Sequence, residues 1–316
     1  MTPTPDYGTL GPGSDISGPD PVQRFDRRPG PQPAILLFAI LLGMLGAFAS
    51  FAVARGNPIL SQLTNLFSPP VAKPTSGKDS RQIDRLMPQK QAETLLEMAV
   101  AKSDGAVDQI SSRASEWQGQ VEWNPQIANL TTAALNSDDM RVRESGVEVE
   151  LAAYGLGKNS GSFDYVMKSV DSSDHAQKIW ALWALGLLAN RGVETEHGVG
   201  VLVEHLSDPD VDTRRWAVES LALAGSDLSI EPLLKTMHDD ASPVVRERAA
   251  CGIAESGLFT PQQRFTAIPQ LLAYTDDPAL DTQTHAWAFQ ALGDITHQRL
   301  PNDAAAWRAW YAEHGG

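Results

Sequence analysis

Histidine and cysteine are the residues of this 316-residue chain best suited to nucleophilic or metal chemistry. Seven histidines are scattered over the sequence together with one cysteine: His175, His197, His205, His238, His285, His297, His314 and Cys251. None of them belongs to an HExxH zinc motif, and the chain contains neither a GxSxG turn nor a P-loop. A single cysteine also excludes an intrachain disulfide and any CxxC site. The sequence therefore predicts no catalytic, metal-binding or cofactor-binding residue, and it predicts that Cys251 is a small buried hydrophobic residue.

Arginine pairs form a second group of residues that could bind a partner, because a guanidinium binds carboxylates in a bidentate fashion. They are Arg141/Arg143, Arg214/Arg215 and Arg246/Arg248. Five of them are candidates either for binding a partner or for joining neighbouring structural repeats: Arg143, Arg214, Arg215, Arg246 and Arg248. A third group, Trp307, Trp310 and Tyr311, shares one face of a predicted C-terminal helix. This aromatic face is interpreted as a hydrophobic lid over the last repeat, with an exposed docking site as the alternative.

The elements that carry these residues repeat along the chain. Apolar residues at i, i+3, i+4 and i+7, followed by an acid, begin at Phe163, Val199, Ile230 and Ile268, with a weaker copy at Ile127. A second helical segment follows each acidic turn, as in Asp208 to Gly225 and Asp240 to Gly257. No useful alternation of period two is present, so no strands are expected. Helix pairs recurring every 31–38 residues predict an all-α fold, an α-solenoid.

Three motifs resemble the short bacterial type of HEAT repeat: Val142-Arg143-Glu144, Asp208-Pro209-Asp210 with Arg214-Arg215, and Val245-Arg246-Glu247. The resemblance covers about residues 124–295. It implies a right-handed α-solenoid of about five helix pairs, with capping helices at both ends. It also implies that the repeated arginines bind turn acids of neighbouring repeats, here Asp171, Asp208, Asp239 and Asp276. Two copies depart from the pattern, because Ile179–Trp183 and Thr282–His285 supply no arginine after the turn.

Some HEAT-like proteins are enzymes, so the resemblance leaves that alternative open. HEAT-like deoxyhypusine hydroxylases hold iron through His-Glu dipeptides, but no histidine in this chain is followed by glutamate. HEAT-like DNA glycosylases and phycobilin lyases show that the fold can act on ligands. The acidity of the chain argues against the former activity, and no motif supports the latter.

The segment Ala34–Ala54 is the strongest signal outside the repeats. It contains 21 residues without a charge, and at about 1.5 Å per residue a helix of this length matches a hydrocarbon core of about 30 Å. The sequence predicts one transmembrane helix at 34–54, which acts as an uncleaved signal anchor; a cleaved signal peptide ending near Ala54 is the alternative. Arg24, Arg27 and Arg28 precede it and only Arg55 closely follows, which favours a cytoplasmic N-terminus.

Residues 1–33 and 55–88 are rich in proline, glycine and polar residues, and they are predicted to be a disordered tail and a flexible linker. Residues 89–316 form the predicted solenoid domain. With a cytoplasmic N-terminus, this domain lies on the outer or periplasmic side of the inner membrane.

The net charge of −14, from 25 Lys+Arg and 39 Asp+Glu, argues against a nucleic-acid partner. The sequence favours a membrane-anchored scaffold without catalytic activity, which binds a protein or peptide on the concave surface of the solenoid. An enzyme or enzyme accessory of the lyase or hydroxylase type and a purely structural envelope protein are the alternatives.

Overall fold

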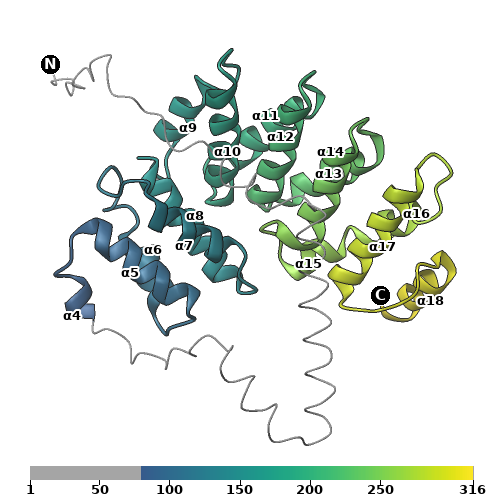
Figure 1. Cartoon of the computed structure of the whole chain (residues 1–316), viewed down its shortest axis with the longest axis horizontal. Coiled ribbons are helices and arrows are strands. Elements are labelled where there is room, and N and C mark those ends of the chain that lie inside the picture. Colours follow the sequence, from purple (N-terminus) through teal and green to yellow (C-terminus); the bar gives the residue numbers. More distant parts are fainter. Residues whose placement is uncertain (1–79, 316) are drawn as a thin grey trace, which may run out of the picture. The chain divides into compact units, whose positions relative to one another are not determined.

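The computed structural model describes residues 80–315, and every regular element in this range is helical (Figure 1). This confirms the all-α prediction for the described part. The predicted tail, the transmembrane segment 34–54 and the linker up to residue 79 lie outside the described residues. Within 80–315, no helix has both the length and the hydrophobicity needed to cross a bilayer. The chain divides into two compact units at Ala153/Tyr154, whereas the sequence predicted a single solenoid domain over residues 89–316.

From residue 80 onward, the N-terminal unit contains five helices around one core: α4 (Ser80–Ile83), α5 (Pro88–Val100), α6 (Ala106–Arg113), α7 (Pro125–Leu135) and α8 (Met140–Ala153). Trp117 is fully buried in this core, and its indole N–H donates to Gln91 Oε1 at 3.1 Å. The linker was predicted to extend to residue 88, but the folded unit begins earlier. The side chain of Ile83 is completely buried, so residues 80–88 are held by apolar contact with α5 and α6.

The C-terminal unit contains the remaining helices: α9 (Ser160–Met167), α10 (His175–Asn190), α11 (Thr195–Glu204), η1 (His205–Ser207), α12 (Val211–Ala224), α13 (Asp227–Asp239), α14 (Pro243–Cys251), η2 (Gly252–Ser256), α15 (Pro261–Phe265), α16 (Ile268–Tyr274), α17 (Thr282–Thr296) and α18 (Ala304–His314). With α7 and α8 of the N-terminal unit, the pairs α9/α10, α11/α12, α13/α14 and α16/α17 correspond to the five predicted copies.

The helix pairs of the C-terminal unit form two layers. The second helices α10, α12, α14 and α17 contact one another in sequence, and we call them the second-helix layer. The first helices α11, α13 and α16 contact one another in the same order (Figure 1). From α11/α12 onward, neighbouring pairs therefore pack on one another through both helices, which is the arrangement of an α-solenoid.

The second helices approach closely because small residues lie between them. Gly186 of α10 faces the backbone of α12, and a Cβ atom built there would lie 2.6 Å from the carbonyl oxygen of Ser220. Beside this contact, the rings of Trp183 and Trp216 meet edge to face, with centroids 5.8 Å apart. Gly225 ends α12 in the left-handed conformation, with a φ of 60°, as the sequence predicted.

Candidate interaction surface

The turns between paired helices are built from aspartates that cap the second helices. Asp174, Asp210 and Asp281 accept hydrogen bonds from the backbone N–H groups three residues later, at 3.1, 2.9 and 2.7 Å. Burial acts to raise the pKa of Asp210, but the backbone N–H and hydroxyl of Thr213 outweigh it and the pKa is lowered. Much of the negative charge in this unit therefore has a structural role.

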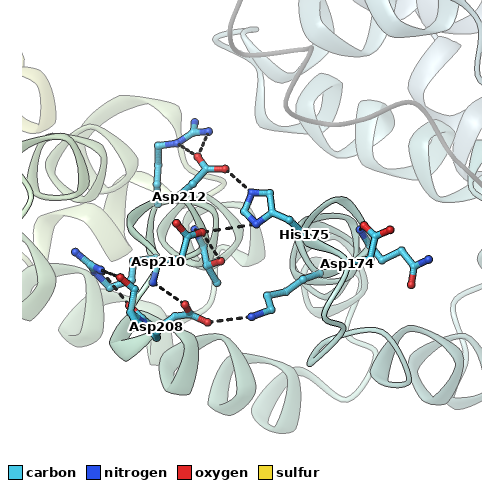
Figure 2. A network of polar contacts seen from close by, with 11 residues as sticks. Asp174, His175, Asp208, Asp210 and Asp212 are labelled. Carbon is cyan, nitrogen blue, oxygen red and sulfur yellow. Dashed lines mark hydrogen bonds and ion pairs between the residues drawn. The ribbon is translucent and has the colours of Figure 1, made fainter.

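Polar contacts join the turns before α12, α14 and α17 to the second helix of the preceding pair. Figure 2 shows the joint between α10 and the turn that precedes α12. Lys178 Nζ lies 3.2 Å from Asp208 Oδ2, and His175 Nε2 lies 3.0 Å from Asp212 Oδ2. The other ring nitrogen of His175 lies 3.6 Å from Asp210 Oδ2, beyond hydrogen-bond distance.

Arg214 and Arg246 continue this pattern at the next two joints. The Nε and Nη2 atoms of Arg214 donate to the carboxylate of Asp240 at 2.8 and 3.0 Å, and Nη1 donates to the carbonyl of Asp208. Arg246 Nη2 lies 2.6 Å from Asp281 Oδ2, and its Nη1 donates to the carbonyl of Asp240 at 2.8 Å. Each arginine thus holds its own turn and the turn of the following repeat.

Arg143 occupies the same helical position in the N-terminal unit, and its Nε donates to the carbonyl of Ser137 in its own turn at 2.5 Å. Contacts that join neighbouring repeats are therefore seen at Arg214 and Arg246, whereas the bond of Arg143 to Ser137 lies within its own turn. The acids differ from those predicted: Asp208 pairs with Lys178, and Asp240 and Asp281 receive the arginines.

The other three predicted acids have different neighbours. Asp239 pairs with Lys235 and His238, and Asp276 pairs with Arg308 at 2.6 Å. Asp171, whose side chain is 90% exposed, lies 3.6 Å from a ring nitrogen of His205. The two or three acids of one turn lie on different sides of that turn. Their spacing along the chain therefore did not show which of them would meet an arginine.

Arg215 and Arg248 differ from Arg214 and Arg246, because their carboxylate partners lie on a second helix and not in a turn. Arg215 Nη2 is 2.7 Å from Asp212 Oδ1, and its guanidinium lies 4.7 Å from the ring centre of Trp216. Arg248 of α14 pairs with Glu219 of α12, and their side chains are only 17% and 9% exposed. Burial acts to lower the pKa of Arg248, but the Glu219 carboxylate outweighs it and the pKa is raised.

A small cleft of about 70 Å³ lies between α14–η2 and α17. Cys251, Glu255, Trp287 and Asp294 line it, together with small alanine side chains. Cys251 is partly exposed here, so the prediction that it is buried was wrong. Its neighbours in the chain are buried, but the helix turns Cys251 towards the cleft. We use the term second-helix surface for Arg215, Glu219, Arg248, Cys251, Trp287 and Asp294.

A wider groove of about 790 Å³ lies among the first helices. Val203 and Leu206 of α11–η1 form one wall, and Pro232 and Thr236 of α13 form the other. Its floor includes Arg214, which is already bound to Asp240. No motif of the sequence analysis indicated this groove, since its walls come from different repeats.

The C-terminal aromatic residues separate into two kinds. Trp307 is 2% exposed, and its indole N–H donates to the carbonyl of Pro301 at 3.0 Å, so it acts as part of a lid. Trp310 and Tyr311 are only half-buried: Trp310 stacks on His314 with ring centroids 5.0 Å apart, and Tyr311 lies against Phe265.

Over the range that the structure describes, no three His, Cys, Asp or Glu side chains are grouped so that they could hold a metal ion.

The comparisons with known proteins match this architecture in part of the chain. Residues 163–254 match the family model of HEAT repeats, from α9 to η2. No curated protein matches the chain. This match and the two helical layers confirm the predicted HEAT-type α-solenoid for this region.

Among solved structures, a designed armadillo repeat protein in complex with the peptide (KR)4 is 18% identical, with a TM-score of 0.32, 65% of this chain covered and 99% of that chain. A second designed armadillo repeat protein is 20% identical, with a TM-score of 0.33, 66% of this chain covered and 100% of the other. An engineered protein is 18% identical, with a TM-score of 0.32, and the coverage is 72% and 95%.

Proposed function

We propose that this protein is a membrane-anchored HEAT-repeat scaffold that binds a protein or peptide partner on its second-helix surface and has no catalytic activity of its own. The HEAT match and the stacked helix pairs support the scaffold role, because stacked repeats offer an extended and continuous binding surface.

The single observation that carries the proposal is the composition of the second-helix surface. It presents arginine, tryptophan and carboxylate side chains from three consecutive second helices, at positions where a solenoid of this kind has its concave face. Arginine and tryptophan are enriched at binding hot spots. The ion pairs of Arg215 with Asp212 and of Arg248 with Glu219 hold the side chains in place before binding, which reduces the entropy cost of association.

The membrane anchor is the second part of the proposal, and it rests on the uncharged segment 34–54. An anchored solenoid searches for its partner within the reach of its linker, which raises the effective concentration at the membrane. The arginines before the segment favour a domain on the periplasmic side. A phosphatase reporter fused after Gly316 should therefore be active only outside the cytoplasm, and activity of a cytoplasmic reporter in its place would contradict the orientation.

The binding surface is tested by capture of membrane proteins with the full-length chain and two matched variants. Gln290→Arg places a bulky cation in the cleft of the second-helix surface, and Gln270→Arg makes the same change on the exposed first helix α16 of the same pair. Gln290→Arg should abolish saturable binding of a partner, and Gln270→Arg should leave it intact. Equal binding by both variants would contradict the assignment of the surface. Turnover of a small molecule by the chain alone would favour the enzyme alternative.

A further inference from the structure

At the joint between the pair α13/α14–η2 and the pair α16/α17, which we call the distal joint, titratable side chains of the two pairs meet at two places. The first involves His238 at the end of α13. Its Nε2 lies 3.3 Å from Asp277 Oδ2 in the turn before α17, and its Nδ1 lies 2.5 Å from Asp239 Oδ1. A neutral imidazole has one donor and one acceptor nitrogen, so only the imidazolium can donate to both carboxylates.

The surroundings of His238 favour the charged ring. Its hydrogen bond to Asp239 is the largest cause of a raised pKa for His238; burial opposes it, and Asp277 adds to it. Lys235 of α13 also pairs with Asp239, and His285 of α17 lies 2.8 Å from the carbonyl oxygen of Asp277. The ring of Tyr274 from α16 packs against His238 with centroids 5.0 Å apart. These contacts therefore connect α13 to helix α16 and to the turn before α17.

The second contact lies on the opposite side of the joint, in the cleft of the second-helix surface. Asp294 of α17 and Glu255 of η2 both line this small cleft, and a hydrogen bond between two carboxyl groups requires that one of them hold a proton. Burial, followed by the charge of Glu255, raises the pKa of Asp294. Gln290 and His297 act weakly in the other direction, and Glu247 adds a further carboxylate to the wall of the cleft.

We propose that the distal joint is a proton-sensitive hinge, closed while His238 and the Glu255–Asp294 pair hold their protons and loosened when they lose them. Each contact joins the same two helix pairs. Loss of the proton costs His238 one of its two hydrogen bonds and places two negative charges in one cleft at Glu255 and Asp294. Because a solenoid is stabilised by interfaces between neighbouring repeats, weakening one interface releases α16 and α17 locally. The cleft lies in this joint, so opening of the hinge changes the distance of Trp287 and Asp294 on α17 from the cleft residues of α14 and η2.

The direction of the pH effect is the same for both contacts. A group with a raised pKa in the folded state contributes its stabilisation below its unfolded pKa and loses it as the pH rises through its folded pKa. For Asp294 the loss begins above the ordinary value of 3.8, and for His238 above 6.5. The distal joint should therefore be tighter at pH 5.5 than at pH 8.

Hydrogen exchange of the full-length chain tests the proposal, with protection factors for the amides of α16 and α17 compared at pH 5.5 and 8. We expect wild-type protection to fall about threefold at the higher pH, the size typical of partly exposed charged contacts. His238→Gln should reduce this fall. Asp294→Asn should keep protection high at pH 8, because an uncharged amide in the cleft removes the repulsion between two carboxylates. His175→Gln, at the α10–α12 joint, is the matched control and should retain the wild-type dependence in α16 and α17.

Wild-type protection that does not depend on pH, or a His238→Gln variant with the full wild-type dependence, would overturn the proposal. The titration of the His238 ring in the wild-type chain, followed by nuclear magnetic resonance, needs no variant. We expect its midpoint above that of histidine in peptides, and a midpoint below that value would also overturn the hinge.

Discussion

The substitution Gly186→Ala measures how strongly the second-helix layer depends on close backbone contact. The added Cβ would lie 2.6 Å from the carbonyl oxygen and 3.1 Å from the Cα atom of Ser220. Ordinary contacts of this kind begin near 3.4 Å, and both obstacles are backbone atoms of α12, so α10 and α12 must move apart. Alanine in a helix gains up to about 1 kcal/mol over glycine, and overpacking of this type costs about 1–3 kcal/mol.

The overpacking term should dominate, since Trp183 and Trp216 pack beside the same contact and also lose their fit. We expect a net loss of about 1–2 kcal/mol in the free energy of unfolding of the C-terminal unit. For a unit of this size, that loss lowers the melting temperature by roughly 2–8 °C. Thermal and urea unfolding followed by circular dichroism measure it, with the two units treated as separate transitions where their midpoints differ.

Gly200→Ala is the matched control, because a Cβ at this position of α11 meets no atom within 4 Å. This variant should be as stable as wild type or more stable, by up to about 1 kcal/mol. A Gly186→Ala protein that is at least as stable as Gly200→Ala would refute the reasoning, since helix propensity alone would then explain both substitutions.

Two further predictions concern the polar joints. Arg214→Gln should destabilise the C-terminal unit by about 2 kcal/mol, because it leaves a buried carboxylate unpaired, whereas Arg215→Gln should cost only about 0.5 kcal/mol; equal urea midpoints for the two variants would contradict this. Because the pKa of Asp210 is lowered in the folded state, its carboxylate stabilises the fold at pH values above 3.8, the ordinary pKa of the group. This stabilisation is lost as the pH falls through the lower pKa of the folded state. Urea unfolding at pH 7 and pH 3 should therefore show a smaller acid-induced loss in Asp210→Asn than in wild type, and the exposed control Asp164→Asn should behave like wild type.

Local features of the fold were predictable because they depend on residues close in sequence. The capping residue Asp210 and the terminating Gly225 each act within one turn, and the sequence pattern indicated the helix boundaries that they produce. The same holds for the apolar stripes that define each helix pair.

Contacts between repeats were less predictable. The equivalence of Arg214 and Arg246 could be inferred from their spacing, but their partners Asp240 and Asp281 depend on how the turn directs each of its acids.

The exposure of Cys251 was also not predictable. At Cys251 the helix passes into the π-helical turn η2, in which the N–H of Gly257 donates to the carbonyl of Gly252. An i to i+5 bond of this kind has no clear sequence signature.

Site-specific photo-crosslinking in living cells tests the central claim most directly. A photoreactive residue placed at Gln290, in the cleft of the second-helix surface, or at Gln270, on the first helix of the same pair, reports what contacts each layer in the full-length chain. The account predicts one discrete crosslinked protein from position 290, in the membrane fraction, and none from position 270. Crosslinks of the same partner from position 270 alone, or no discrete product from position 290, would contradict a scaffold that binds through its second helices.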